Sequence, residues 1–382
     1  MSSGFLTRFG FAMETQITAP TWPSTSPATL TALQPVLAPT PAGEATLATY
    51  PSTVTYGPRD SAVVQTLPAN LTLPLPVTYA GLEPLWTCAL GYQAKRISGT
   101  VYPATITAGA YRHRFEIDNV LQAEHWTTAD GWESGDGLTS GQRKTRRLTL
   151  AGTIGDVSAW EWLSAMVGQL DLQVQAGQAM QMTLSFVAGS LDETPAANTL
   201  AALQALTVPT AARVFWHQSV LRLATYSSSV VLDSDDIIAC SQFRLTLDNA
   251  LDVPYSERIS QAPDEPGRGE RPPTIRGTLT VPRYTADTLL SAQRAGTAHM
   301  MDLIFTGGQI GATGQTYTLE LYLPMLYFTT ASPVWNNAGV ISQTLAFEAV
   351  APSTAAAGMP TTIHATPLIV QCQTADNTHY LE

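Results

Sequence analysis

SQFRLTLD, from Ser241 to Asp248, is the stretch from which the rest of the chain is interpreted. Apolar and polar residues alternate strictly in it, which is typical of a β-strand with one buried and one exposed face. GQLDLQVQ, from Gly168 to Gln175, shows the same alternation 73 residues earlier. Each stretch is followed by a second alternating one, Met180 to Val187 or Thr274 to Val281, and then by a helical pattern. We therefore expect an internal repeat of hairpin plus helix.

The composition sets limits on the class of protein. A chain of 382 residues with 45% hydrophobic residues exceeds what one core usually supports, so two structured units are expected. Only 13% of residues are charged, about half the usual share. A weakly charged surface suits a protein that becomes covered by copies of itself.

The net charge of −11 disfavours a sequence-reading nucleic-acid binder, because such proteins neutralise phosphates with basic residues. An acidic balance fits a conduit that must not bind a polyanion, and it equally fits simple solubility. Cys88, Cys240 and Cys372 are too scattered for a disulfide framework or a CxxC metal site. The first 16 residues lack a signal-peptide pattern, and no apolar run reaches the ~18 residues of a membrane span.

Further segments follow from local patterns. Two helices are expected, one capped by Thr194 with Pro195 in its first turn and one capped by Thr285 and ending at Gly296. Residues 156–167 fit either a helix or a strand. Other strands are expected at 112–117, 145–154, 213–224, 229–232, 301–306, 316–328 and 339–350.

Two stretches lack such patterns. Residues 17–84 are rich in Thr, Ala and Pro, which disfavours a central strand and predicts an extended segment, with a disordered linker as the alternative. Asn249 to Pro273 separates the second pair of hairpin strands, and its mixed charges and its length predict a contact surface. We divide the chain into an N-terminal segment (1–84), two β modules (85–235 and 236–352) and a C-terminal arm (353–382).

No catalytic motif is present. The histidines at 113, 125, 217, 299, 364 and 379 have no metal-ligand spacing, and the chain has no GxSxG, Walker or GxGxxG sequence. TGGQIGATGQ, from Thr306 to Gln315, predicts a β-turn loop rather than a phosphate cradle. Asp233, Asp235 and Asp236 could bind a cation, but an acidic turn fits them better. We expect no enzyme activity, no cofactor and no metal.

The order of these segments resembles the tail tube proteins of long-tailed bacteriophages, in the group with two tube-type modules in one chain. The similar segments in the second half are SQFRLTLD, TIRGTLTV, TADTLLSAQRA, LELYLPMLYF and GVISQTLAFEA. In the first half they are RFGFAMET, LWTCALGY and MVGQLDLQVQAGQAMQMTLSFVAG. The resemblance implies a mainly β fold of two tandem sandwich or half-barrel modules, each with a short flanking helix, plus extended Pro/Thr-rich arms.

By this resemblance the chain is a structural virion protein that assembles in the host cytoplasm into stacked rings around a channel for genome DNA. Its partners would be itself, the tape-measure protein and other tail proteins, with no membrane and no sequence-specific DNA binding. The residues expected to line the channel are Gln169, Asp171, Gln173, Gln175, Gln181, Thr183, Ser185, Arg244, Thr246 and Asp248. Those expected to join ring to ring are Asp252, Glu257, Arg258, Asp264, Glu265, Arg268, Glu270 and Arg271.

Two further expectations concern assembly and rival functions. If both modules are complete, three chains supply the strands of six single-module subunits, so trimeric rings with pseudo-sixfold symmetry are favoured over hexamers. A tail terminator or baseplate ring protein is the closest alternative function. A carbohydrate-binding β-sandwich is a more distant alternative, because such a protein would be expected to carry a secretion signal.

Overall fold

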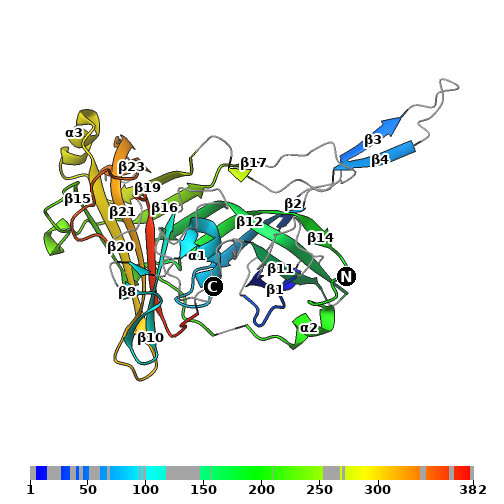
Figure 1. Cartoon of the computed structure of the whole chain (residues 1–382). Coiled ribbons are helices and arrows are strands. Elements are labelled where there is room, and N and C mark those ends of the chain that lie inside the picture. Colours follow the sequence, from blue (N-terminus) through cyan, green and yellow to red (C-terminus); the bar gives the residue numbers. More distant parts are fainter. Residues whose placement is uncertain are drawn as a thin grey trace.

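The chain is mainly β, as expected, in the computed structural model (Figure 1). The structure describes residues 6–14, 27–34, 40–42, 46–50, 61–66, 69–93, 96–97, 100–117, 147–155, 157–208, 210–252, 267–268, 272–335, 341–360 and 365–378. Within these ranges, 18 strands are connected into one branched sheet. Three separate strand pairs lie outside this sheet: β3 (Thr46–Tyr50) with β4 (Ser61–Thr66), β7 (Arg96–Ile97) with β8 (Thr100–Val101), and β17 (Leu251–Asp252) with β18 (Gly267–Arg268).

The centre of the sheet is a series of antiparallel strands in two blocks of four. The first block has the order β2 (Thr40–Ala42), β5 (Ala69–Pro76), β13 (Gln181–Ala188) and β12 (Ser158–Gln175). The second has the order β16 (Gln242–Asp248), β19 (Thr274–Val281), β23 (Ile341–Ala349) and β21 (Thr316–Thr330). The blocks join where β12 pairs with β16.

The two alternating stretches were expected to be the same strand in two copies of a module, and this expectation is wrong. Leu172 of β12 lies directly opposite Leu245 of β16, and these positions are also 73 residues apart, so the two similar strands are antiparallel neighbours. Alternation reports which side chains are buried, and it does not tell which strands pair.

The modules instead repeat from β5 and from β19. Each of these strands has eight residues and is followed, after six residues, by an eight-residue helix, α1 (Glu83–Leu90) or α3 (Thr288–Ala295). Both helices end at a left-handed glycine, Gly91 or Gly296. Each module then has a hairpin, β11 (Leu148–Ile154) with β12 or β20 (His299–Gln309) with β21, whose second strand pairs with β13 or β23. In the first module, β6 to β10 lie between the helix and this hairpin. The repeated unit is therefore strand, helix, hairpin and return strand.

β12 belongs to two parts of the sheet, and it resolves the open assignment of this stretch as a strand from Ser158 onward. Its first half pairs with β11 (Leu148–Ile154) and β14 (Ser190–Asp192), and β11 pairs with β1 (Leu6–Met13). Ser164 has a positive φ of 56°, and its backbone N–H and its hydroxyl both donate to buried Glu14. This bulge lies where β12 passes from the first group of strands to the second.

A further group of strands extends from β21. It contains β15 (Ser219–Thr225), β20 (His299–Gln309), β24 (Ile369–Thr374), β10 (Ala110–Ile117), β9 (Ala104–Thr107) and β6 (Gly91–Gln93). β24 is buried between β10 and β21, so the expectation that residues 353–382 form only an arm is wrong for this strand. The strand expected at 229–232 is absent, and β15 begins six residues later than expected.

The Pro-rich segment also contributes to the core. β5 pairs with β13 along its whole length, although Pro74 and Pro76 lie in it. β2 pairs with Asn70–Thr72 on the other side, so among the described residues the prolines lie where β5 has one neighbour, a position that tolerates proline. β3 (Thr46–Tyr50) and β4 (Ser61–Thr66) form a hairpin that projects from the body in Figure 1.

The helices differ from expectation at their starts. α2 spans Leu200–Ala205 and is capped by Thr199, whose hydroxyl accepts from Ala202 N–H, instead of by Thr194. α3 ends at Gly296 as expected, but its N-cap is Asp287 instead of Thr285. The remaining short elements are β7 (Arg96–Ile97), β8 (Thr100–Val101), β17 (Leu251–Asp252), β18 (Gly267–Arg268), β22 (Pro333–Trp335) and the 3-10 turns Trp216–Gln218 and Ser234–Asp236.

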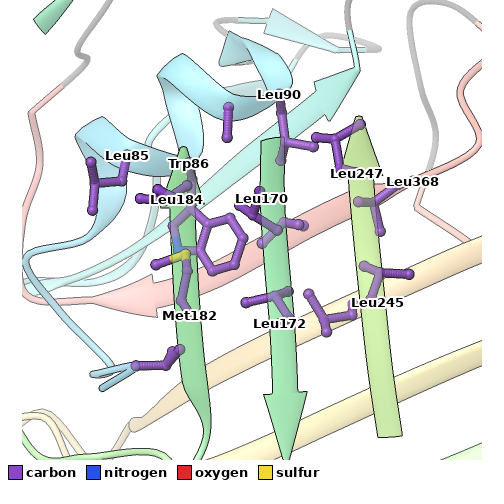
Figure 2. Close-up of a cluster of buried hydrophobic side chains, with 14 of the residues drawn as sticks. Leu85, Trp86, Leu90, Leu170, Leu172, Met182, Leu184, Leu245, Leu247 and Leu368 are labelled. Atoms are coloured by element: carbon purple, nitrogen blue, oxygen red, sulfur yellow. The ribbon is translucent and has the colours of Figure 1, made fainter. Parts of the chain in front are cut away.

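The unexpected helix α1 covers the apolar side of the central strands, as Figure 2 shows. Its side chains Leu85, Trp86 and Leu90 are buried against β13, β12 and β16. The strand residues labelled in the same buried cluster in Figure 2 are Leu170, Leu172, Met182, Leu184, Leu245 and Leu247. Since α1 closes this side of β13, β12 and β16, the exposed residues of these three strands lie on the opposite side.

Candidate functional site

The ten residues expected to line a channel all lie on the exposed side of β13, β12 and β16, which we call the polar face together with the same side of β5, β19 and β23. Apolar partners at the alternate positions of these strands are buried. Seven of the ten line one hollow of about 300 Å³: Gln169, Asp171, Gln173, Gln181, Thr183, Ser185 and Arg244. Thr246 lines an adjoining groove, and Gln175 and Asp248 lie at strand ends.

The pairing of β12 with β16 explains why residues from both modules meet. Gln169 lies opposite Asp248, Asp171 opposite Thr246, and Gln173 opposite Arg244. Directly opposite residues of an antiparallel pair share one side of the sheet. The polar sides of both hairpins are therefore one continuous surface.

Arg244, the one cation among the ten, is paired with Asp171 across this junction. Its Nε donates to both carboxylate oxygens of Asp171 at 3.0 Å, and its Nη2 also donates to Asp171 Oδ2. These hydrogen bonds raise the pKa of the Arg244 guanidinium above its ordinary value, so the group stays protonated. Its positive charge is balanced by the Asp171 carboxylate. A bidentate pair of this kind also fixes the orientation of the arginine.

Two charged residues of the polar face were not among the expected ones. Arg276 of β19 lies directly opposite Glu348 of β23, with Nε and Oε2 separated by 3.4 Å. The alternation in Thr274 to Val281 marks Arg276 as exposed, but the partner strand could not be known from the sequence. Together the polar face carries three carboxylates (Asp171, Asp248 and Glu348) and two guanidiniums, all on described strands.

The base of the long loop is fixed to the helix beneath the sheet. Asn249 is buried, and its Nδ2 donates to the carbonyls of Ala89 in α1 and Val167 in β12, both at 2.9 Å. Asp248 Oδ1 accepts from Ala250 N–H, which supports a positive φ of 50° at Ala250. These contacts set the direction in which the loop leaves β16, and alternation alone gave no signal for them.

Only part of the loop lies in the described residues. Leu251–Asp252 pair with Gly267–Arg268, so the loop begins as a narrow ribbon. For Asp252 and Arg268, the structure therefore gives the position of the backbone in this ribbon. The other expected contact residues lie outside the described residues: Glu257, Arg258, Asp264, Glu265, Glu270 and Arg271.

The acidic turn is held together by its own backbone. Asp233 accepts from Asp235 N–H at 2.8 Å, and Asp236 accepts from Asp233 N–H at 3.0 Å. Within the part of the chain that the structure describes, no group of three His, Cys, Asp or Glu residues is placed to hold a metal ion.

Comparison with known proteins identifies the family. A family model described as phage tail tube protein matches residues 4–349. No curated protein matches the chain. No helix among the described residues is long and apolar enough to cross a membrane. Because the match spans most of the chain and the observed fold is rich in β-strands, the chain belongs to the phage tail tube protein family.

Proposed function

We propose that copies of this protein assemble into stacked rings that form a phage tail tube, with the polar face turned inward to line a conduit for genome DNA during ejection. The observation that carries the proposal is the continuous polar face formed by both modules, opposite a face closed by α1 and the core. We propose a structural role without catalysis.

The charges of the polar face suit a passage for DNA. Rows of unpaired Lys or Arg would bind phosphates through counterion release and slow the polymer. Here Arg244 is neutralised by Asp171, and Arg276 lies beside Glu348. Most other exposed side chains of the face are Gln, Thr and Ser, which hold no net charge. DNA would therefore slide along a surface to which it has little affinity.

The stoichiometry that fits best is three chains per ring. The two four-strand blocks have the same pairing order, and each contains a strand followed by a helix with the same spacing. Three chains with two such blocks each would give 24 strands and pseudo-sixfold symmetry. At a strand spacing of about 4.8 Å and a tilt of about 40°, such a barrel is about 50 Å across at its backbone.

We also propose that the two modules form one body, and that the loop between β16 and β19 contacts the next ring. The loop leaves the sheet at the end of the hairpin, where Asn249 fixes its base. Its charged residues could then pair with a neighbouring ring. The remaining partners would be the tape-measure protein and other tail proteins in the virion, after assembly in the host cytoplasm.

Electron microscopy of the purified protein tests this function. Hollow tubes of uniform width are expected at sufficient protein concentration. Single rings that never stack would favour a tail terminator or baseplate ring protein. A protein that stays monomeric at every concentration would contradict a tube-forming role. A variant with residues 253–266 replaced by a short Gly-containing turn should fold and form rings but fail to stack.

A further inference from the structure

We propose that the outer edge of β21 and β22, residues 327–335, is the docking site for the β2 edge of a second copy of this chain. The proposal rests on the proposed tube function and names the contact by which neighbouring copies would join. It is carried by the comparison of the two four-strand blocks, which have the same strand order but differ in what lies beside their last strand.

In the first block, the place beside the last strand, β12, is occupied by a strand of the same chain. The second half of β12 has β13 on one side and β16 on the other. Val174, near the end of β12, lies opposite Phe243 of β16 and is 1% exposed. The joint between the two blocks is thus an ordinary antiparallel ladder with a closed core.

In the second block the same position has no strand among the described residues. β21 takes the place of β12, because it pairs with β23 as β12 pairs with β13, and α3 packs on it as α1 packs on β12. β20 pairs with β21 only as far as Leu326. Beyond that point β21 and β22 pair with β23 on one side, and the carbonyl of Thr329 receives a 3.4 Å hydrogen bond from Gln293 of α3.

Apolar side chains at this edge are exposed, as expected if a strand of another copy covers them. Trp335 is 72% exposed and Val334 is 49% exposed. Trp335 lies opposite Ile341, on the same side of the sheet as the buried Leu345 and Phe347 of β23. Adjacent exposed apolar side chains at the rim of a core, one of them a tryptophan, favour a surface that is covered in an assembly.

The matching edge is at the other end of the same molecule. β2 is the first strand of its block and pairs with β5, just as β16 is the first strand of its block and pairs with β19. Within the chain β16 pairs with β12, the last strand of the other block. By the same arrangement, β2 of a neighbouring copy would pair with β21. Strand directions agree as well. Each block consists of antiparallel steps in the same order, so the new pair would be antiparallel like β12 and β16. The two edges differ, so the contact is head-to-tail, and such contacts close into a ring when the rotation from one copy to the next completes a full turn.

The fluorescence of Trp335 in dispersed and assembled protein tests this contact. The chain has eight tryptophans, so the signal of Trp335 is taken as the difference between the parent and a Trp335→Phe variant. We expect this difference signal to be quenched by acrylamide in the dispersed subunit. In assembled tubes the quenching should fall at least fivefold, and the emission should shift to shorter wavelength.

A second pair of variants tests the same edge without spectroscopy. Trp335→Arg should fold, as judged by circular dichroism and thermal unfolding, yet need at least about tenfold more protein to form rings. Ala201→Arg, an exposed position on α2, is the matched control and should assemble like the parent. Tubes in which Trp335 stays as accessible as in the free subunit would overturn the edge contact and leave the tube function standing. A parent protein that forms no tubes would overturn the tube function itself.

Discussion

Arg244 and Asp171 form a bidentate ion pair across the junction of the two modules, on the exposed side of the sheet. The Asp171 side chain is 16% exposed and that of Arg244 is 52% exposed. Such a pair contributes little to stability, on the order of 1 kcal/mol or less. Its larger effect is electrostatic, because it removes a free positive charge from the surface that we assign to the channel.

Replacing Asp171 by Asn should therefore make the tube wall retain DNA. The substitution leaves Arg244 charged and without its carboxylate partner, and each added free cation strengthens phosphate binding through counterion release. We expect assembled Asp171→Asn tubes to carry down short DNA duplexes on sedimentation at low salt, and to release them as salt rises.

Two variants control this experiment. Gln173→Asn alters the same surface without changing its charge, and it should retain no more DNA than the parent. Asp171→Asn combined with Arg244→Gln should return retention to the parent level. Equal retention by Asp171→Asn and Gln173→Asn tubes would show that Arg244 does not face the DNA.

Gly277 should not accept a side chain. A Cβ at this position of β19 would lie 2.2 Å from Phe347 and 2.6 Å from the carbonyl oxygen of Arg244. We expect Gly277→Ala to lower the free energy of unfolding by about 1–3 kcal/mol, measured by urea denaturation. Gly308→Ala is the control, because nothing lies within 4 Å of its added Cβ. A Gly277→Ala protein as stable as Gly308→Ala would mean that β19 and β23 pack differently.

The equivalent helices α1 and α3 should differ in how much they contribute to the free energy of unfolding of the subunit. Trp86 of α1 is 2% exposed within the cluster of Figure 2, and its replacement by Ala should cost about 3–5 kcal/mol. Leu290 of α3 is only half-buried, and no residue of α3 is fully buried. Leu290→Ala should therefore cost about 1 kcal/mol in the dispersed subunit, as followed by thermal unfolding. Equal costs would contradict the assignment of α1 alone to the subunit core.

Stability should fall as the pH rises from about 4.5 to about 7, because of Glu83. Burial raises the pKa of this carboxyl from 4.5 to about 7, and the charge of Asp376 adds to the effect. In that window the folded state keeps a proton that the unfolded chain has lost, so deprotonation favours unfolding. The loss amounts to about 3 kcal/mol across the window.

Urea denaturation at a series of pH values measures this effect. Glu83→Gln keeps an oxygen for the hydrogen bond from Gly81 N–H but cannot ionise. Its unfolding free energy should change less between pH 5 and pH 8 than that of the parent, and above pH 7 it should be the more stable protein. A parallel pH dependence in the two proteins would assign the effect to other groups.

Most strands could be predicted from the sequence because one of their sides is wet. Thr274 to Val281 was expected with the bounds that β19 has, since every second residue packs into the core. The exposed sides of β12, β13 and β16 were predictable for the same reason, whereas Glu348 and the exposed side of β5 were not among the expected residues. α1 was not predictable in this way, because all eight of its residues are buried and it has no polar side to give a helical period.

Strand pairing could not be read from alternation. Leu172 and Leu245 occupy equivalent places in two similar stretches, yet they face each other across a ladder instead of marking two copies of a module. Likewise, β24 comes from a segment whose Thr, Ala and Pro content suggested an arm, and it is buried only because β10 and β21 accept it from both sides. Such contacts depend on residues far apart in the sequence.

A reconstruction of the assembled tube from electron micrographs tests the central claim most directly, because it shows both the symmetry and the face that lines the channel. The account predicts three chains per ring, a continuous barrel containing β12 and β16, and Gln173 and Arg244 facing the lumen. Six chains per ring would contradict the stoichiometry. Gln173 and Arg244 on the outer surface or within a contact between subunits would contradict the assignment of the polar face.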